Sequence, residues 1–425
     1  MTIQALHKTY LEHPSICTDT RKLNKGDIFF ALKGDNFNGN EYAEQALKKG
    51  ASFAVVDEKR FATEKGTIWV ENVLESLQKL ANFHRHYCNA QIIGLTGSNG
   101  KTTTKELIHA VLRTKYRAVA TKGNLNNHIG VPLTLLSIKK DTEIAIVEMG
   151  ANHQKEIEFL SKLAEPDFGY ITNFGKAHLE GFGGIDGVIK GKSELYDYLL
   201  ENDKAVFMNA DDPVQRQKLE RCIKKYGYSQ NDPKFYQIQM GRPDPYISLK
   251  VEDTLINSQL IGAYNFTNCC AAMLIGKYFN VPMEKIKEAI ESYTPQNNRS
   301  QIITKKGHQI ILDAYNANPT SMKVALGNFK SMKGKNKVLF LGDMFELGDS
   351  AKEEHQHISD LTYNLGFENV FFVGENFYHT QNNFQKFKRF KDLETYLKAN
   401  TVILNATILI KGSRGMALER ILDLI

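Results

Sequence analysis

The residues with the clearest chemical potential form the run Thr96–Thr103, with the sequence TGSNGKTT. A short apolar run, Ile92–Leu95, precedes it, and a segment with helical spacing, Lys105–Lys115, follows it. A strand, a glycine-rich turn and a helix start form the geometry that holds nucleotide phosphates, because backbone N–H groups and the helix dipole face the anion. A lysine adds positive charge there, and a threonine hydroxyl can ligate Mg²⁺. The run therefore predicts a phosphate-binding loop.

The spacing of this run departs from the complete P-loop pattern. That pattern requires its first glycine at position 95, where the chain has Leu95, and both Gly94 and Gly97 are out of register with it. A simple glycine turn before a helix, with a solvated lysine, therefore remains an alternative.

Two further candidates follow predicted strands. Glu148 ends the apolar run Ile144–Glu148, and His178 comes just after the run Gly169–Thr172. Ligands of parallel α/β sheets bind beyond the carboxyl ends of the strands, so a carboxylate at this edge can hold Mg²⁺ directly or through water. For His178, a ligand role and a structural role both remain open.

Lys192 lies within the predicted helix Val188–Leu200. An ammonium group close to Mg²⁺ would be repelled by the ion, so the residues alone predict that Lys192 is an exposed helix residue.

Three polar segments also follow or flank predicted strands. Gly123–His128 (GNLNNH) precedes a helix-like run, Asp313–Met322 (DAYNANPTSM) follows a strand, and Lys411–Arg414 (KGSR) follows the last strand. Asn, Asp, Pro and Ser are ordinary turn and helix-cap residues, so a structural role is open for either amide-rich segment. Together they indicate recognition of a polar ligand, and the two cations of the third segment suit a carboxylate or a phosphate.

The elements that position these residues indicate an α/β protein of three domains, since 425 residues exceed one ordinary core. We predict a small N-terminal α/β domain over residues 1–87, a central domain with a parallel sheet over 88–294, and a Rossmann-like domain without a phosphate loop of its own over 295–425. The helical run Leu74–Tyr87 connects the first two, and a β-rich patch, Phe235–Leu260, lies late in the second. The other predicted strands are Asp27–Leu32, Ala51–Val56, Ala118–Thr121, Ala205–Asn209, Ile310–Asp313, Val338–Leu341, Val370–Val373 and Thr407–Lys411.

The composition narrows the function classes. A net charge of +6 suits anionic small molecules, and the basic run Lys386–Lys391 is expected to be a solvated face that leads into a helix, so no nucleic-acid partner is predicted. No apolar run is long enough to cross a bilayer, and the N-terminus has no apolar signal segment. The five scattered cysteines, without a CxxC pair, indicate reduced thiols in a cytoplasmic protein.

Four motifs carry a resemblance to a known family. They are Gly123–Pro132 (GNLNNHIGVP), Tyr315–Pro319 (YNANP), Leu341–Gly348 (LGDMFELG) and Lys411–Arg414 (KGSR). With these motifs the chain resembles the Mur ligases over essentially its whole length. The short phosphate loop is the form that this family uses.

The resemblance implies roles for individual residues. ATP and Mg²⁺ would be the cofactors, and Lys192 matches a lysine that members carry as a carbamate, which turns the cation into an anion. Lys101, Lys192, His178 and Glu148 would be catalytic, and Thr102, Glu148, His178 and Lys192 would hold the metal. The nucleotide would be bound by Gly97, Ser98, Asn99, Gly100, Lys101, Thr102, Thr103, Asn268 (adenine), Arg299 (phosphate) and Asp313 (ribose). The substrates would be bound by Thr18, Asp19, Thr20, Arg21, Lys33, Gly34, Asn126, Asn127, Asn316, Asn318, Ser321, Lys411 and Arg414. Three places depart from the family pattern: Tyr264 stands where a histidine is usual, Asn38–Asn40 (NGN) stands where Asp-Gly-His is usual, and Gln301 stands where an acidic residue often follows the arginine.

The implied activity is an ATP-dependent amide ligation, through an acyl phosphate, that joins D-alanyl-D-alanine to UDP-N-acetylmuramoyl-tripeptide in the cytoplasm. The enzyme is expected to be a monomer. Another amide ligase of the same superfamily, adding lysine or diaminopimelate or extending folate, remains an alternative. So does a protein of a different class, a nucleotide-binding regulator without ligase activity, and a nucleic-acid-stimulated ATPase is a weaker alternative.

Overall fold

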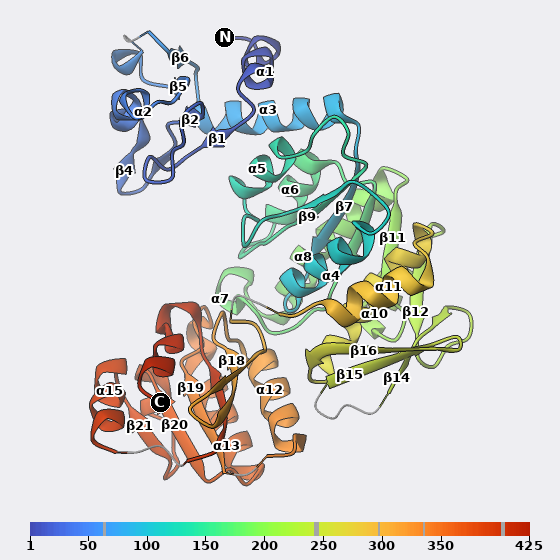
Figure 1. Cartoon of the computed structure of the whole chain (residues 1–425), viewed down its shortest axis with the longest axis vertical. Coiled ribbons are helices and arrows are strands. Elements are labelled where there is room, and N and C mark those ends of the chain that lie inside the picture. Colours follow the sequence, from blue (N-terminus) through green and yellow to red (C-terminus); the bar gives the residue numbers. More distant parts are fainter. Residues whose placement is uncertain (63–64, 242–245, 296–297, 335, 401–403) are drawn as a thin grey trace. The chain divides into compact units, whose positions relative to one another are not determined.

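Strands alternate with helices through most of the computed structural model, which describes residues 1–425 except 63–64, 242–245, 296–297, 335 and 401–403 (Figure 1). The described chain forms two compact units. One comprises Met1–Gly94, Tyr116–Gly150 and Glu158–Phe168, and the other comprises Leu95–Lys115, Ala151–Ile157 and Gly169–Ile425. The mixed α/β architecture agrees with the predicted fold class.

The N-terminal region holds a four-stranded sheet in the order β1-β2-β5-β6, whose neighbouring strands are parallel. Its β2 strand is fully buried, and Phe29 packs with Ala43, Ala46 and Ala54 in a small core. The bounds are α1 (Ile3–Glu12), β1 (Ile16–Cys17), β2 (Ile28–Phe30), β3 (Lys33–Gly34), β4 (Phe37–Asn38), α2 (Ala43–Lys48), β5 (Phe53–Val56), β6 (Thr67–Trp69) and α3 (Val73–Cys88).

Helix α3 is the predicted connector. The Asn72 side chain accepts a hydrogen bond from Glu75 N (2.9 Å) and caps its start, and Asn89 ends it in the left-handed conformation with φ 54°. Beyond the N-terminal sheet, α3 contacts α5, and Arg85 pairs with Asp167 at 3.1 Å. The helix therefore carries the chain out of the N-terminal sheet.

The central region holds a seven-stranded sheet in the order β13-β12-β11-β10-β7-β9-β8 and a separate three-stranded antiparallel sheet, β14-β15-β16. The predicted strands of this region are confirmed to within two residues. The β-rich patch corresponds to β13–β16 with residues 242–245 outside the described residues, whereas β12 was not predicted. The strands are β7 (Gln91–Thr96), β8 (Ala118–Ala120), β9 (Ile144–Glu148), β10 (Phe168–Ile171), β11 (Ala205–Asn209), β12 (Lys225–Ser229), β13 (Tyr236–Gln237), β14 (Gln239–Met240), β15 (Tyr246–Val251) and β16 (Thr254–Ile261).

The helices of the central region include α10, whose residues Asn268–Gly276 are all buried. Two of the five cysteines lie there. All five are free thiols, as the sequence predicted, and all five are buried. The helices are α4 (Lys101–Leu112), α5 (Gly130–Leu136), α6 (Glu156–Ala164), α7 (Leu179–Phe182), α8 (Ile185–Glu201), α9 (Pro213–Lys218), α10 (Tyr264–Tyr278) and α11 (Met283–Ser292).

The C-terminal region holds a six-stranded sheet in the order β17-β18-β22-β19-β20-β21, which is parallel except for the edge strand β17. Its core includes Ile310, Phe340 and Ile410. The elements are β17 (Gln301–Lys305), β18 (His308–Asp313), α12 (Pro319–Ser331), β19 (Lys337–Gly342), α13 (Ala351–Asn364), β20 (Asn369–Val373), α14 (Glu375–Tyr378), β21 (Gln385–Phe387), α15 (Phe390–Ala399) and β22 (Thr407–Lys411). Short 3₁₀ turns lie at Gly39–Tyr42, Lys59–Phe61, Gly348–Ser350, Arg414–Met416 and Leu418–Asp423.

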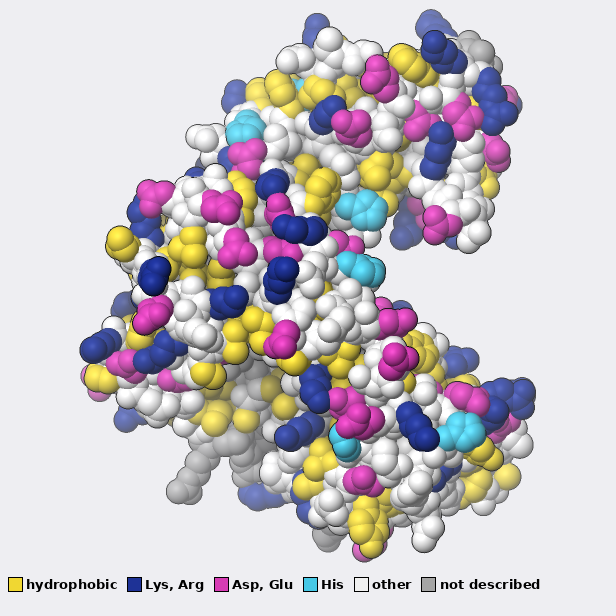
Figure 2. Space-filling view, turned by 180° about the vertical axis from the view of Figure 1, so that it is seen from behind, with side chains coloured by type: hydrophobic (Ala, Val, Ile, Leu, Met, Phe, Trp, Pro, Cys, Tyr) yellow, Lys and Arg dark blue, Asp and Glu magenta, His cyan; other side chains and the backbone are white. Residues whose placement is uncertain are grey.

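The surface carries charges of both signs. On the face shown in Figure 2, Lys and Arg side chains are interspersed with Asp and Glu side chains, without a continuous basic stripe. Within the described ranges, no helix combines the length and the apolar character that crossing a membrane requires.

Candidate functional site

The phosphate loop joins β7 to α4 through two glycines in conformations that other residues rarely adopt. Gly97 has φ 138° and Gly100, which precedes the first residue of α4, has φ 79°. A Cβ atom at Gly97 would lie 2.0 Å from Thr172 Oγ1, and one at Gly100 would lie 2.6 Å from Asn268 Oδ1. Positive φ and close approach therefore both require glycine at these two positions.

Hydrogen bonds from the loop that follows β10 hold the phosphate loop in place. Ser98 N donates to Asn173 O (3.0 Å), Asn99 N donates to the Asn173 side chain (3.1 Å), and Ser98 Oγ donates to Gly175 O (2.9 Å). The Lys101 ammonium lies over the loop and donates to Gly97 O at 2.7 Å. Asn173 was not predicted as a site residue, although its place directly after a strand could have indicated it.

The first turn of α4 directs its N–H groups and the positive end of its dipole towards this loop. Thr102 and Thr103 are buried here, at 4% and 8% exposure. Asn268 of α10 packs against the same turn, because its side chain accepts a hydrogen bond from Thr104 Oγ1 (3.0 Å) and donates one to Asn265 (2.8 Å). The structure thus brings the predicted adenine ligand Asn268 to the predicted phosphate loop.

Glu148 is the last residue of β9 and its side chain is almost completely buried, at 1% exposure. Its carboxylate accepts a hydrogen bond from the Asn126 side chain at 2.8 Å, so the structure brings these two predicted residues together. Asn127 instead caps its own turn, because its side chain accepts hydrogen bonds from Ile129 N and Gly130 N.

Lys192 is fully buried, so the expectation of an exposed helix residue was wrong. Val188, Leu195 and Leu199 are also buried, and Lys192 falls at helical spacing on their apolar stripe, a signal that the sequence did contain. Its ammonium donates to Ala151 O at 2.9 Å and lies 4.8 Å from the Phe182 ring. Burial, and secondly the charge of Lys101, hold the pKa of Lys192 well below its usual value. A lowered pKa favours the neutral amine, which is the form that adds carbon dioxide to become a carbamate.

His178 and Glu346 contact each other, with Nδ1 of the histidine 2.5 Å from the carboxylate. Both residues lie in the left-handed region although neither is glycine, with φ 53° and 62°. The close pairing with His178 lowers the pKa of Glu346 and outweighs the opposing effect of burial, so this pKa lies below its usual value. Glu346 belongs to the Leu341–Gly348 motif, but nothing in that motif indicates a contact with His178. Strained backbone of this kind concentrates at functional sites.

The carboxyl ends of β18 and β22 carry a second group of predicted residues. Lys411 is buried and its ammonium lies 2.6 Å from Asp313 Oδ2. The other oxygen, Asp313 Oδ1, accepts a hydrogen bond from Ser300 N at 3.1 Å. The predicted ribose ligand and a predicted substrate ligand therefore form an ion pair.

Two arginines flank one tyrosine next to this ion pair. The Arg299 guanidinium lies 3.5 Å from the centre of the Tyr315 ring and that of Arg414 lies 5.9 Å away. Arg299 Nε is buried and has no hydrogen-bond partner among the described residues. A buried guanidinium N–H of this kind suits an anionic ligand.

The amide-rich segment before α12 is partly structural. Asn318 and Ser321 form a capping box at the start of α12, and the Asn316 side chain accepts a hydrogen bond from Ala317 N. In addition, Asn318 Nδ2 donates to Asn99 Oδ1 of the phosphate loop at 2.7 Å. The segment therefore both caps a helix and contacts the nucleotide loop.

The predicted residues of the N-terminal region lie at the surface. Arg21 pairs with Asp19 at 2.8 Å, and this hydrogen-bonded pairing lowers the pKa of Asp19 to about 2. Thr18 and Thr20 are neighbours of Asp19 in the chain, and Thr20 O accepts a hydrogen bond from Lys49. Lys33, next to Gly34 in the β3–β4 hairpin, pairs with Asp57 at 2.8 Å.

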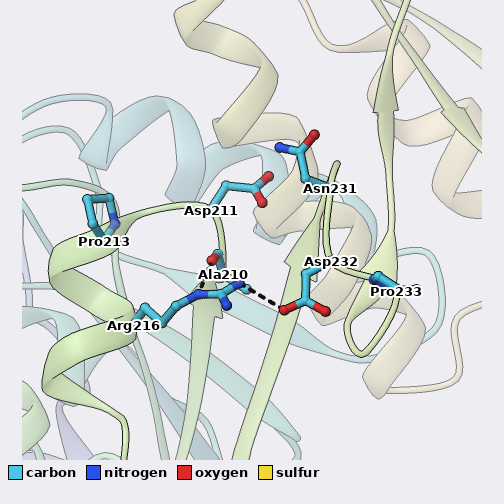
Figure 3. Close-up of a pocket in the computed structure, with 7 residues that line it drawn as sticks. All are labelled: Ala210, Asp211, Pro213, Arg216, Asn231, Asp232 and Pro233. Atoms are coloured by element: carbon cyan, nitrogen blue, oxygen red, sulfur yellow. Dashed lines mark hydrogen bonds and ion pairs between the residues drawn. The ribbon is translucent and has the colours of Figure 1, made fainter.

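A separate cavity of 460 Å³ lies at the carboxyl ends of β11 and β12 (Figure 3). Three of its polar side chains, those of Asp211, Arg216 and Asp232, are bonded to one another or to neighbouring residues. Arg216 pairs with Asp232 at 3.1 Å and donates to Ala210 O, and Asp211 accepts hydrogen bonds from Ser229 and Gln230. We assign no ligand to this cavity.

The donor chemistry of the predicted metal ligands fits Mg²⁺. Over the part of the chain that the structure describes, no three His, Cys, Asp or Glu side chains group closely enough to hold a metal by themselves. A buried carboxylate from Glu148 and a buried hydroxyl from Thr102 are hard oxygen donors, and Mg²⁺ typically takes one or two such ligands together with phosphate oxygens and water.

Comparison with known proteins finds the same architecture. The family model of the Mur ligase family, catalytic domain, matches residues 14–85, that of the Mur ligase middle domain matches 95–276, and that of the Mur ligase, glutamate ligase domain, matches 298–414. The UDP-N-acetylmuramoyl-tripeptide–D-alanyl-D-alanine ligase of Bacillus subtilis is 36% identical over 96% of this chain and 93% of its own length.

Two solved structures are similar as well. MurF from Acinetobacter baumannii has a TM-score of 0.84 at 29% identity and covers 96% of this chain and 93% of its own. The MurF ligase from Thermotoga maritima in complex with ADP has a TM-score of 0.83 at 26% identity and covers 97% of both chains. The chain belongs to the Mur ligase family. Within that family, relatives at 36% and 33% identity, from Bacillus subtilis and Escherichia coli, are UDP-N-acetylmuramoyl-tripeptide–D-alanyl-D-alanine ligases, and each is matched over more than 90% of its own length.

Proposed function

We propose that this protein is the ATP-dependent ligase that joins D-alanyl-D-alanine to UDP-N-acetylmuramoyl-tripeptide, with release of ADP and phosphate. The observation that carries the proposal is the phosphate loop, where two glycine-only positions lead into α4 and Lys101, the first residue of α4, binds the loop. The similarity to the D-alanyl-D-alanine ligase of Bacillus subtilis over nearly the whole chain supports this acceptor.

The first step activates a carboxylate, which does not itself react with amines because its oxygen is a poor leaving group. The terminal carboxylate of the tripeptide attacks the γ-phosphorus of ATP, forming an acyl phosphate and ADP. Lys101 and the first turn of α4 neutralise the charge that develops on the phosphoryl oxygens. Thr102, Glu148 and His178 would hold Mg²⁺, which would supply further charge neutralisation when bound.

The second step forms the amide bond. The amino group of D-alanyl-D-alanine attacks the acyl carbon, and the C–O bond to phosphate breaks. Because both steps occur between bound substrates, the protein contributes mainly position and charge. A carbamate on Lys192 would convert a buried amine, on which the charge of Lys101 acts, into an anion and would suit the same metal.

We assign the remaining nucleotide and substrate contacts to residues described in the site. Asn268 contacts adenine, Asp313 the ribose and Arg299 a phosphate, while Asn316, Asn318, Ser321 and Arg414 serve the acceptor side. Asp19, Arg21 and Lys33 bind the UDP-sugar. The domains are residues 1–87, 88–294 and 295–425, and the ranges of the three family models support these boundaries. We further propose that the protein is cytoplasmic, because nucleotide-linked precursors and ATP are found there. We also propose that it is a monomer.

An assay of phosphate release tests this proposal. With UDP-N-acetylmuramoyl-tripeptide, ATP and D-alanyl-D-alanine all present, we expect steady release, and omission of any one should stop it. Replacing the dipeptide by lysine, diaminopimelate or glutamate should also stop it. Steady hydrolysis that ignores the acceptor would favour a nucleotide-binding regulator, and turnover with a single amino acid would favour another Mur ligase activity.

A further inference from the structure

Tyr264 occupies the position at which a histidine is usual in the family, and the proposed roles leave it unused. It is the first residue of α10, four residues before Asn268, which packs against the phosphate loop. Its hydroxyl is hydrogen-bonded to the hydroxyl of Ser300. A side chain at the nucleotide end of α10 is thus tied to the segment that leads into β17.

Ser300 continues this connection to the proposed ribose ligand. It is 7% exposed and has φ 48°, a conformation that is uncommon for a residue other than glycine. Its N–H group donates to Asp313 Oδ1 at 3.1 Å, while Lys411 binds Asp313 Oδ2. Both carboxylate oxygens are therefore oriented, one by Lys411 and the other through Ser300 and Tyr264.

The surroundings of Tyr264 keep its hydroxyl in place and neutral. Gly262 has φ 83°, and a Cβ atom there would lie 2.6 Å from the Tyr264 ring and 2.6 Å from Asn328 Nδ2. Asn328 of α12 also accepts a hydrogen bond from Ala263 N at 3.3 Å. Burial, and secondly the negative charge of Asp313, raise the pKa of the Tyr264 hydroxyl, so it remains a protonated group beside that carboxylate.

We propose that Tyr264 is a positioning residue of the nucleotide site, whose hydroxyl fixes Ser300 and thereby aims Asp313 at the ribose. This inference rests on the proposed role of Asp313. Because the Tyr264–Ser300–Asp313 connection leads to the ribose and not to the reacting carboxylate, it affects nucleotide affinity and leaves the chemical step and the dipeptide affinity unchanged.

Calorimetric titration of the whole protein with ADP tests the proposal in the variant Tyr264→Phe, which removes only the hydroxyl. Loss of one hydrogen bond to an oriented group should raise the Kd of ADP about fivefold. The KM for ATP should rise with it, while kcat and the KM for D-alanyl-D-alanine stay within about twofold. Unchanged ADP affinity in Tyr264→Phe would overturn the proposal.

A second variant, Ser300→Ala, tests the same connection, since it removes the hydroxyl to which Tyr264 is hydrogen-bonded. We expect a similar loss of ADP affinity, and the double variant should be no weaker than the weaker of the two single variants. Losses that add up in the double variant would contradict a shared connection. Tyr236→Phe is the matched control, because it removes a tyrosine hydroxyl that is bonded to Glu252 in the turn between β15 and β16, and its ADP affinity should equal that of the unaltered protein.

Asp313→Asn separates the inference from the role on which it rests. If Asp313→Asn weakens ADP binding and Tyr264→Phe does not, the positioning role fails while the ribose assignment stands. If Asp313→Asn leaves ADP affinity unchanged, the ribose assignment itself fails.

Discussion

Predicted ligand-binding residues gather at two sheet edges, the phosphate loop after β7 and the carboxyl ends of β18 and β22. The two edges are built in different ways. At the phosphate loop, the backbone conformation shapes the site, because Gly97 and Gly100 have positive φ and Lys101 binds carbonyl groups of its own loop. At the carboxyl ends of β18 and β22, paired side chains form the site, because Asp313 and Lys411 neutralise each other at 2.6 Å. The first edge is ready for an anion, whereas the second is a set of oriented polar groups.

A sequence reveals the first kind of site more readily than the second. A loop that only glycine can form leaves a local motif of fixed spacing, and that motif predicted the first edge. An ion pair between two residues on different strands of one sheet leaves no local motif. Sequence therefore predicted the members of the second edge without predicting that they bind each other.

The largest expected effect concerns Lys192, whose ammonium group interacts with that of Lys101 at the first edge. Replacing Lys192 by Ala should lower kcat by about 10²–10³-fold, because a charge that stabilises the transition state is lost. Lys190→Ala, an exposed lysine on the same helix, is the control and should keep full activity. Partial recovery of Lys192→Ala by a short carboxylic acid would support the carbamate, and full activity without it would refute that role.

Lys411→Met breaks the side-chain-built edge. It leaves the Asp313 carboxylate without its partner in a largely buried site, and the free energy of unfolding should fall by about 3 kcal/mol. Lys398→Met breaks the exposed pair with Glu394 and should cost less than about 1 kcal/mol. Urea unfolding measures both, and equal losses would show that burial of the Lys411 pair has no special weight.

Gly97→Ala breaks the backbone-built edge. The new Cβ would lie 2.0 Å from Thr172 Oγ1 at a φ of 138°, so the loop must move. Strain of this kind costs about 1–3 kcal/mol, and we expect ADP affinity to fall about tenfold or more in a calorimetric titration. Gly26→Ala has φ 97° but open space around the new Cβ, so its ADP affinity should not change. Wild-type affinity in Gly97→Ala would mean that the loop does not depend on its backbone conformation.

The smallest effect is expected at the cavity beyond the carboxyl ends of β11 and β12, a third sheet edge to which we assign no ligand. Arg216→Ala removes a half-exposed guanidinium that is bonded to Asp232 and to Ala210 O. Steady-state kinetics should give kcat and KM values within about twofold of the unaltered protein, because exposed ion pairs contribute little. A large loss would show that this third edge takes part in ligation.

Much of the fold could be predicted because its strands are apolar runs between turns. Ile144–Glu148 and Ala205–Asn209 coincide with β9 and β11. Strand β12 could not be predicted, since its sequence, KYGYS, has too few apolar residues to be recognised as a strand. In the site, the predicted exposure of Lys192 was wrong although Val188 and Leu195 define its buried face, because a charged helix residue is normally solvated. The Tyr264–Ser300 bond could not be predicted, because it joins residues 36 positions apart.

The most direct test of the central claim, that this site activates a carboxylate by phosphoryl transfer, follows one oxygen atom. The tripeptide substrate is labelled with ¹⁸O in its terminal carboxylate, and the released phosphate is analysed by mass spectrometry after turnover with ATP and D-alanyl-D-alanine. An acyl phosphate requires that one carboxylate oxygen leaves with the phosphate, so we predict one ¹⁸O atom in each phosphate released. Phosphate without label, formed while the amide product accumulates, would contradict the account.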